Sequence, residues 1–319
     1  MDCNIDTASN APVVVFVYNR LQYTIETLEA LDRNLLADES ELYIICDAAR
    51  TKDKIKDVNL VREYVSEYEN RSRFSKVTVY YAEKNRGLAN SIINSITEIL
   101  YIYKKVIVLE DDCVPTQDYL KYMNDALNFY EKNAKIWSVT GYAYDFKSLD
   151  TYNHDVYMAW RGCSWGWGTW EDRWKKVDWN VNDYKAFKFS IQKRLKFMRG
   201  GNDLPSMLKA QMNGKIDSWA VRWCYAQSKL DMYTVYPKIS RINNIGFNSG
   251  EHGTVGMSQK DVSMLSCSDK QCVYENLEID EQLEKEMKNK NRLTIKSRIV
   301  GYIELQKRVK KRNKQEKNV

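Results

Sequence analysis

The sequence has few of the features that mark fibrous, disordered or membrane-spanning chains. Its 319 residues include only 4 Pro and 13 Gly, with 44% hydrophobic and 29% charged residues, which excludes collagen-like, Pro-rich and disordered classes. No apolar run approaches the ~20 residues that span a bilayer. The longest core-like stretch is Val13–Tyr18. Because a chain of this size buries roughly three quarters of its unfolded surface, we expect a self-sufficient core.

Cysteine pairs and a leader segment are also lacking. The seven Cys residues are odd in number and scattered, and they form no C-x-x-C pair. This predicts reduced thiols, and neither a disulfide framework nor a zinc cage. The first ten residues carry neither the basic nor the apolar region of a secretory signal. We therefore expect a cytoplasmic protein.

The net charge of +6 conceals an uneven distribution. Residues 288–319 hold 12 Lys and Arg against two Glu, which leaves 37 basic and 41 acidic side chains in residues 1–287. An acidic body argues against nucleic-acid binding, because that function needs a basic face. In the tail, apolar residues near one helical face predict a basic amphipathic helix on the anionic inner face of the plasma membrane. Packing of the same stripe against the body is the alternative.

The first third alternates between short apolar strands and amphipathic helices. We predict strands at Val13–Val17, Leu42–Cys46, Val77–Tyr81 and Val106–Leu109, and helices at Leu21–Leu36, Ile55–Tyr68 and Leu88–Leu100. This alternation predicts an α/β fold with a mostly parallel sheet and helices on both faces. In such sheets, ligands bind at the carboxyl ends of the strands.

An acidic triplet, Glu110-Asp111-Asp112, directly follows the fourth strand. Adjacent carboxylates repel unless a cation or a basic group neutralises them, and hard oxygen ligands suit Mn²⁺ or Mg²⁺ shared with substrate phosphates. A solvated turn is the alternative. The triplet lies at a carboxyl end, as do Asn19 and Asp47 after their strands, and this position favours the metal site.

Three other segments are candidates for chemistry, each with a structural alternative. Arg86 and Gly87 open a helix whose N-terminus favours an anion, although a simple βα turn explains them equally. Asp217 lies beside aromatic residues that could tune a general base, but the residues alone favour a helix N-cap. His252 lies in a Gly-rich loop that could close over a metal or a phosphate, or it is an inert exposed side chain.

The middle of the chain is rich in tryptophan. All nine Trp residues lie between positions 137 and 223, and Trp alternates with Gly around residue 166. Indoles flanked by Gly form flat, accessible surfaces that suit sugar rings. We interpret Trp165 and Trp167 as a ligand platform and the remaining Trp residues as core.

Together these segments resemble a GT-A-fold glycosyltransferase, and are similar to bacterial family 2-like transferases related to animal N-acetylglucosaminyltransferase I. The resemblance covers roughly residues 11–256 and is carried by Tyr18-Asn19-Arg20, Asn85-Arg86-Gly87-Leu88, Leu109-Glu110-Asp111-Asp112, Trp165–Trp170, Asn243–Gly246 and Gly250-Glu251-His252. The acidic, DxD-type motif is common by itself, whereas the ordered set is specific. One departure is that Glu110 occupies the first acidic position.

The resemblance implies a role for each matching residue. It assigns Mn²⁺ or Mg²⁺ to Asp112 and His252, and acceptor activation to Asp217, which moves Asp217 from a cap to a catalytic candidate. The implied donor-binding residues are Tyr18, Asn19, Arg20, Asp47, Arg86, Glu110 and Asp111. The implied acceptor-binding residues are Trp165, Gly166 and Trp167.

The implied activity is metal-dependent transfer of a hexosyl or N-acetylhexosaminyl group from a nucleoside-diphosphate sugar to a hydroxyl of a glycan or lipid-linked saccharide. Inversion at the anomeric carbon and a place in bacterial surface-polysaccharide synthesis are expected with it. The predicted parts are a nucleotide-sugar half over residues 1–135, an acceptor and catalytic half over 136–260, and an extension over 261–319. A sugar-phosphate nucleotidyltransferase and a non-catalytic carbohydrate-binding protein are the alternatives.

Overall fold

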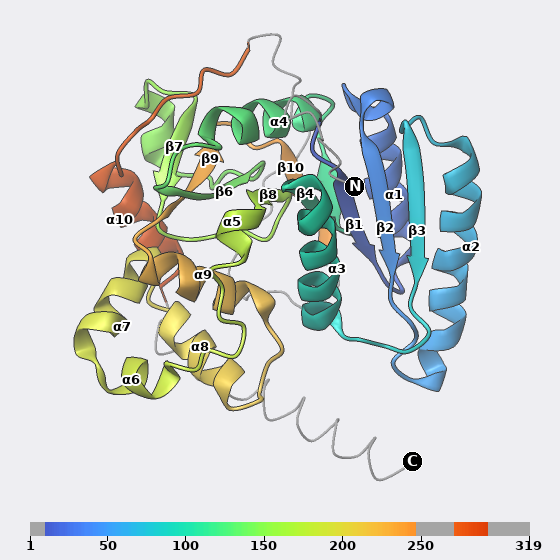
Figure 1. Ribbon diagram of the computed structural model, residues 1–319. Helices are drawn as coiled ribbons and strands as arrows, with labels where there is room; N and C mark the ends of the chain where they lie inside the picture. The colour runs from blue at the N-terminus through green and yellow to red at the C-terminus, as the bar shows by residue number, and fades with distance from the viewer. Residues whose placement is uncertain (1–9, 247–270, 293–319) are drawn as a thin grey trace.

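A computed structural model describes residues 10–246 and 271–292 and shows a mixed α/β fold (Figure 1). Within the described residues the central sheet has eight strands in the order β3-β2-β1-β4-β8-β6-β9-β7. In sheet order these are Lys76–Tyr81, Glu41–Cys46, Val13–Val17, Lys105–Glu110, Trp167–Trp170, Ile136–Thr140, Tyr233–Pro237 and Val156–Ala159. β8 and β7 run antiparallel to their neighbours, and the other pairs in the sheet are parallel.

The first half of the sheet confirms the predicted strands. β1 pairs in parallel with both β2 and β4, so Val15 lies opposite Ile44 on one side and Leu109 on the other. All five residues of β1 are buried, because both faces of the strand are covered. A continuous Val/Phe run suits a strand that is buried on both faces.

Helices cover both faces of the sheet, as predicted. The helices are α1 Leu21–Asp32, α2 Ile55–Arg71, α3 Leu88–Tyr103, α4 Tyr119–Tyr130, α5 Glu171–Trp174, α6 Tyr184–Phe189, α7 Ile191–Phe197, α8 Leu204–Met212, α9 Trp219–Lys229 and α10 Glu281–Lys290. Val13, Val15 and Val17 pack with α1, α2 and α4 on one face. Val14 and Phe16 pack with α3 and α9 on the other. The mostly parallel α/β sheet with helices on both faces, which the GT-A resemblance implies, is therefore present.

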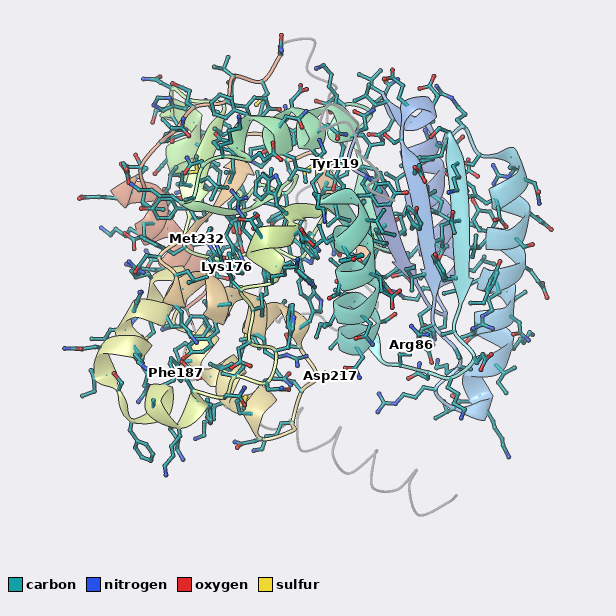
Figure 2. All side chains as sticks on the ribbon, viewed as in Figure 1. Arg86, Tyr119, Lys176, Phe187, Asp217 and Met232 are labelled. Atoms are coloured by element: carbon teal, nitrogen blue, oxygen red, sulfur yellow. The ribbon has the colours of Figure 1, made fainter. Side chains whose placement is uncertain are left out.

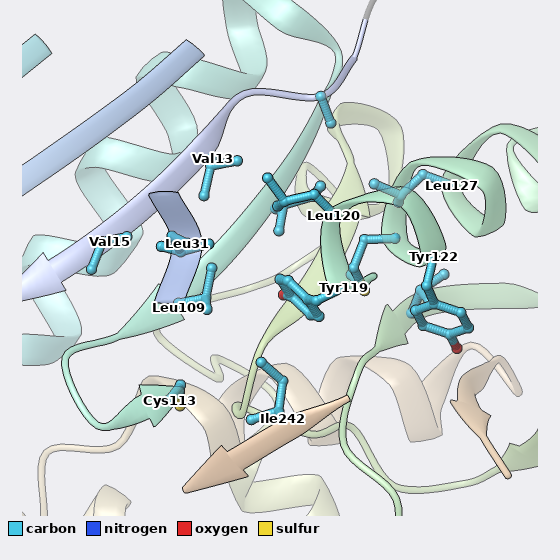
Figure 3. Packing of buried hydrophobic residues seen from close by; sticks show 14 of the residues in the cluster. Val13, Val15, Leu31, Leu109, Cys113, Tyr119, Leu120, Tyr122, Leu127 and Ile242 are labelled. Carbon is cyan, nitrogen blue, oxygen red and sulfur yellow. The ribbon is translucent and has the colours of Figure 1, made fainter. Parts of the chain in front are cut away.

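Two short strands lie outside the large sheet and connect its halves. β5, Cys113–Pro115, directly follows the acidic triplet and pairs antiparallel with β10, Ile242–Asn244. Figure 3 shows Cys113 and Ile242 on these neighbouring strands, close to Leu109 at the end of β4. The pairing brings the end of the second half to the acidic triplet.

Residues 271–292 pack against the second half of the fold. Leu283 and Met287 of α10 are buried in a cluster with Tyr144, Phe146 and Tyr236. The predicted basic amphipathic helix lies beyond these residues, outside the described part of the chain. None of the helices within the described residues is both long and apolar enough to cross a bilayer.

Candidate active site

Arg20 neutralises the acidic triplet at the carboxyl edge of the sheet. Its Nη2 lies 2.9 Å from Asp112 Oδ2, and the same nitrogen pairs with Asp111 Oδ1. Arg20 Nε also donates to Asp111 Oδ2 at 3.3 Å. Arg20 directly precedes α1 and the triplet directly follows β4, so the parallel pairing of β1 and β4 brings them together. One guanidinium thus bridges two buried carboxylates.

Burial and the neighbouring carboxylates raise the pKa values of Glu110 and Asp111. Burial, with the neighbouring Asp112 and Asp111 carboxylates, raises the pKa of Glu110 to about 8. Burial raises the pKa of Asp111 to about 6, although the charge of Arg20 opposes this rise. Positive charge next to these carboxylates favours their ionised forms, as the charge of Arg20 does for both.

The chain after β10 closes one side of the triplet. The Ile245 backbone N–H donates to the Asp112 carbonyl at 2.9 Å, and the Asn244 side-chain amide lies 3.4 Å from Asp112 Oδ1. A Cβ on residue 246 would overlap the Asp112 carboxylate, so glycine is required there for this approach. The segment 244–246 therefore contacts Asp112 of the triplet, and closure of this loop on a nucleotide, which the resemblance implies, stays a prediction. The predicted metal ligand His252, later in the same loop, lies outside the described residues.

Asp47 holds the loop between β3 and α3. Its carboxylate accepts the backbone N–H groups of Arg86 at 2.9 Å and Gly87 at 3.1 Å, and the Asn85 side-chain amide at 3.0 Å. The Ala48 N–H adds a fourth bond at 2.8 Å. Asp47 thus positions the loop that precedes α3, and direct contact between Asp47 and a nucleotide stays a prediction.

Asp217 faces this loop from the second half of the chain. A Cβ added to Gly87 would lie 3.5 Å from Asp217 Oδ2, so the carboxylate approaches the backbone at the start of α3. Figure 2 shows Asp217 and Arg86 at the same end of the molecule. The Asp217 side chain is 60% exposed, and Arg222 Nη2 lies 3.7 Å from its Oδ1. Ser218 Oγ accepts the Val221 N–H at 3.3 Å, so the N-cap of α9 is Ser218, and a cap role for Asp217 is wrong.

The predicted acceptor platform is wrong for Trp167 and Gly166. Trp167 is 0% exposed, and its ring centroid lies 4.9 Å from that of Trp219 on α9. Gly166 is also buried, and a Cβ there would lie 2.5 Å from Ile242 Cγ1. The Trp–Gly alternation is explained by β8, which inserts between β4 and β6 and presents Trp167 to the core. Trp165 is half-buried and contacts Tyr142 edge-on, with the two ring centroids 4.6 Å apart. Its acceptor role stays a prediction.

The remaining donor-side residues lie in the loops around the same edge. The Tyr18 hydroxyl accepts the Arg50 N–H at 2.9 Å and so links the loops after β1 and β2. Asn19 is half-buried next to Arg20. Arg86 is exposed, and its hydrogen bond to Asp47 is made by its backbone N–H. The structure therefore brings Tyr18, Asp47 and Arg86 to one edge, where their contact with a donor stays a prediction.

The triplet fits a divalent cation that is shared with a substrate. The described residues contain no group of three or more His, Cys, Asp or Glu side chains arranged to hold a metal alone. Mg²⁺ is usually held by about one or two carboxylates together with substrate phosphates, so a full protein cage is not required. Buried Asp111 and Asp112, which already share one cationic partner, provide this kind of site.

Two arginines with positioning roles were missed by sequence reasoning. Arg62 of α2 donates to the Ala82 carbonyl at 2.7 Å and to the Asp47 carbonyl at 3.4 Å, and so ties the ends of β2 and β3 together. Arg222 pairs with Asp217 and donates to the Trp179 carbonyl at 3.0 Å. Neither lies in a motif. Only its position one helical turn after Ser218 marks Arg222 as a neighbour of the α9 N-terminus.

Comparisons with known proteins give only distant structural similarities. No protein-family model matches the sequence, and no curated protein matches it. Among solved structures, a mannosyltransferase from Pyrobaculum calidifontis, PcManGT, in complex with GDP-Man and Mn²⁺, is 14% identical, with 72% of each chain covered and a TM-score of 0.39.

The S. aureus protein TarS is similar over shorter stretches. Its 1–349 fragment is 10% identical with a TM-score of 0.37, and 71% of this chain aligns with 60% of that fragment. For a longer TarS structure the identity is 19% and the TM-score 0.30, with 41% of this chain and 21% of that one covered. Likenesses this distant assign the chain to no family, so a function must be inferred from its own residues.

Proposed function

We propose that this chain is a metal-dependent glycosyltransferase that uses a nucleoside-diphosphate sugar and a hydroxyl acceptor. The observation that carries the proposal is the buried acidic triplet at the carboxyl edge of β4, bridged by Arg20 and closed by residues 244–246. A carboxylate from the other half of the fold, Asp217, faces the same edge across Gly87. A cation site and a separate base on opposite sides are what direct sugar transfer requires.

On the donor side, Asp112 would hold Mn²⁺ or Mg²⁺ with its carboxylate, and His252 is the further protein ligand that the resemblance implies. When bound, the metal offsets the negative charge that develops on the leaving nucleoside diphosphate. Arg20 keeps the Asp111 and Asp112 carboxylates together, and Glu110 and Asp111 lie next to the position of the ribose. The loop held by Asp47 presents Arg86 toward the donor.

On the acceptor side, Asp217 would remove the proton of the attacking hydroxyl. Its carboxylate is solvent-accessible, so an acceptor can reach it, and Arg222 Nη2 lies 3.7 Å from its Oδ1. A single base on the face opposite the leaving group gives direct displacement, with inversion at the anomeric carbon. The acceptor is a glycan or a lipid-linked saccharide, and bacterial surface-polysaccharide synthesis is the proposed context.

A nucleotidyltransferase is the alternative that shares a carboxylate-bound metal. The two reactions release different products, because sugar transfer releases a nucleoside diphosphate and nucleotidyl transfer releases pyrophosphate. A binding protein would release neither. The position of Asp217 favours sugar transfer, because a displacement at phosphorus would not need a base at that side of the site.

The decisive experiment is product analysis with Mn²⁺ in two arms, one with a panel of UDP, GDP and CMP sugars and one with nucleoside triphosphates and sugar 1-phosphates. We expect release of the nucleotide from one sugar nucleotide, no pyrophosphate, and loss of release in the Asp112→Ala variant. Asp57→Asn, a change on the outer surface of α2, is the matched control and should retain full turnover. Pyrophosphate as the product would overturn the proposal in favour of nucleotidyl transfer.

A further inference from the structure

An apolar and basic patch lies on the outer side of the second half, where the short helices α6 and α7 follow one another (Figure 1). Phe187 and Phe197 point inward and contact Tyr225 of α9, with ring centroids 5.0 Å and 5.4 Å away. Three neighbouring apolar side chains point outward instead. Phe189 and Ile191 are each 73% exposed and Leu195 is 59% exposed.

The charged side chains of α6 and α7 are all of one sign. Residues 184–199 contain six Lys and Arg and no Asp or Glu. Two of the six, Lys196 and Arg199, pair with Asp231 beside α7. The other four are exposed and surround the apolar side chains: Lys185, Lys188, Lys193 and Arg194. We call these four residues, together with Phe189, Ile191 and Leu195, the α6–α7 patch.

The patch differs from the other exposed apolar residues of the protein. On α2, for example, Ile55 and Leu60 are 48% and 39% exposed, but Asp57 and Glu63 lie between and beside them. A cluster of Phe, Ile and Leu on helices whose charged residues are all basic is typical of helices that lie in a membrane interface. There, the apolar side chains enter the acyl boundary while Lys and Arg contact anionic headgroups.

We propose that the α6–α7 patch docks this protein on an anionic phospholipid bilayer. Charge disfavours two occupants from within the protein, because a second copy docked through the same surface would bring the same basic patch, and residues 288–319 are themselves strongly basic. Aliphatic Ile191 and Leu195 offer no stacking surface to nucleic-acid bases, whereas they suit acyl chains. The occupant that matches both the apolar centre and the basic border is therefore an anionic lipid surface.

Docking in this way would orient the candidate site. Figure 2 shows Phe187 of α6 and Asp217 toward the same end of the molecule. A membrane that contacts the patch would therefore lie toward the same end of the molecule as Asp217. This orientation bears on the acceptor only if the proposed transferase activity is correct, whereas the docking itself does not depend on that activity.

The test is flotation of the full-length protein with phosphatidylcholine vesicles, with and without phosphatidylglycerol. We expect the protein to bind the vesicles that contain phosphatidylglycerol at least about tenfold more strongly than those that do not. High salt should weaken the binding to the anionic vesicles. K188Q/K193Q/R194Q should reduce that binding by up to about a hundredfold at low salt, because each basic residue contributes roughly fivefold. F189S/I191S/L195S should reduce it by about tenfold or more.

Two matched variants and a local measurement distinguish vesicle binding by this patch from vesicle binding by other parts of the chain. I55S/L60S and K52Q/K56Q alter exposed apolar and basic residues elsewhere and should bind as the unmodified protein does. Anionic vesicles should also slow amide hydrogen exchange within residues 185–195. The proposal is overturned if the patch variants bind like the unmodified protein and hydrogen exchange in this segment is unchanged. The protein would then bind vesicles through its C-terminal tail or not at all.

Discussion

At the scale of single residues, Arg20 has the clearest testable role. Its guanidinium pairs with both Asp111 and Asp112, which are 4% and 9% exposed. Removing one partner of a buried ion pair leaves an uncompensated charge, typically at a cost of about 3–5 kcal/mol, and less where the arginine is partly exposed as here. We expect Arg20→Met to lower the melting temperature in metal-free buffer. Added Mn²⁺ should then recover more stability in this variant than in the unmodified protein.

Thermal unfolding with EDTA and with Mn²⁺ measures this difference. Arg50→Gln, which removes an exposed guanidinium from a neighbouring loop, is the control and should leave the Mn²⁺ response unchanged. A Mn²⁺-dependent rise in melting temperature that is equal for Arg20→Met and the unmodified protein would show that Arg20 and the metal do not act on the same carboxylates.

Glu110 gives a pH prediction. Its folded pKa of about 8 lies above the ordinary value of 4.5, so the folded state holds a proton that the unfolded state loses between these pH values. The stability contributed by this proton is complete below pH 4.5 and is lost as the pH rises through about 8. In metal-free buffer, Glu110→Gln should therefore raise the melting temperature at pH 8.5, by about 2–4 °C for each kcal/mol.

The same substitution should have little effect at pH 5, where the carboxyl of the unmodified protein is already protonated. Melting curves of both proteins across this pH range, each with EDTA, provide the measurement. A constant difference between the two curves at every pH would mean that ionisation of Glu110 does not limit stability.

At the scale of elements, two adjacent residues at the start of α9 have different roles, one as the helix cap and the other as the proposed base. Ser218 caps the helix and Asp217 does not. Ser218→Ala should therefore lower stability by about 1 kcal/mol. Asp217→Asn should leave stability unchanged and reduce turnover by about 10²-fold or more, while nucleotide binding survives.

The two variants are controls for each other, because they change adjacent residues at one helix end. Thermal unfolding, turnover with the identified donor, and nucleotide titration together test the assignment. An Asp217→Asn variant that unfolds at lower temperature, or that retains full turnover, would remove Asp217 from the mechanism.

Elements also show which features could be predicted from the sequence. The strands and helices of the first half were predicted because continuous Val-rich runs and a helical apolar period are local signals, and the carboxyl-edge rule correctly placed Asp47 and the triplet at one edge. The environment of Trp167 depends on β8 pairing with β4, a strand about sixty residues earlier, which no local pattern reveals. The choice of Ser218 over Asp217 as the cap was missed because both residue types favour N-caps at adjacent positions.

At the scale of the whole molecule, the candidate site joins the two halves of the chain. The first half contributes the triplet, Arg20 and the loop held by Asp47, and the second contributes residues 244–246 and Asp217. The buried indoles of Trp167, Trp219 and Trp223 fix α9 against the sheet, with ring centroids 4.9 Å and 5.6 Å from that of Trp167. The packing of these indoles thus holds Asp217 in position without the help of a bound donor.

A nucleoside diphosphate with Mn²⁺ should therefore stabilise the whole fold as one unit. Ligand at a concentration about 100 times its Kd adds roughly 2.7 kcal/mol to the free energy of unfolding. We expect one cooperative melting transition that moves upward with Mn²⁺ and the matching nucleoside diphosphate together, and excess EDTA should abolish both this shift and turnover. Asp112→Ala should lose both as well, whereas Asp217→Asn should keep the shift and lose turnover. Full turnover in EDTA would exclude a metal-dependent mechanism, and a shift that Asp112→Ala retains would place the nucleotide away from the triplet.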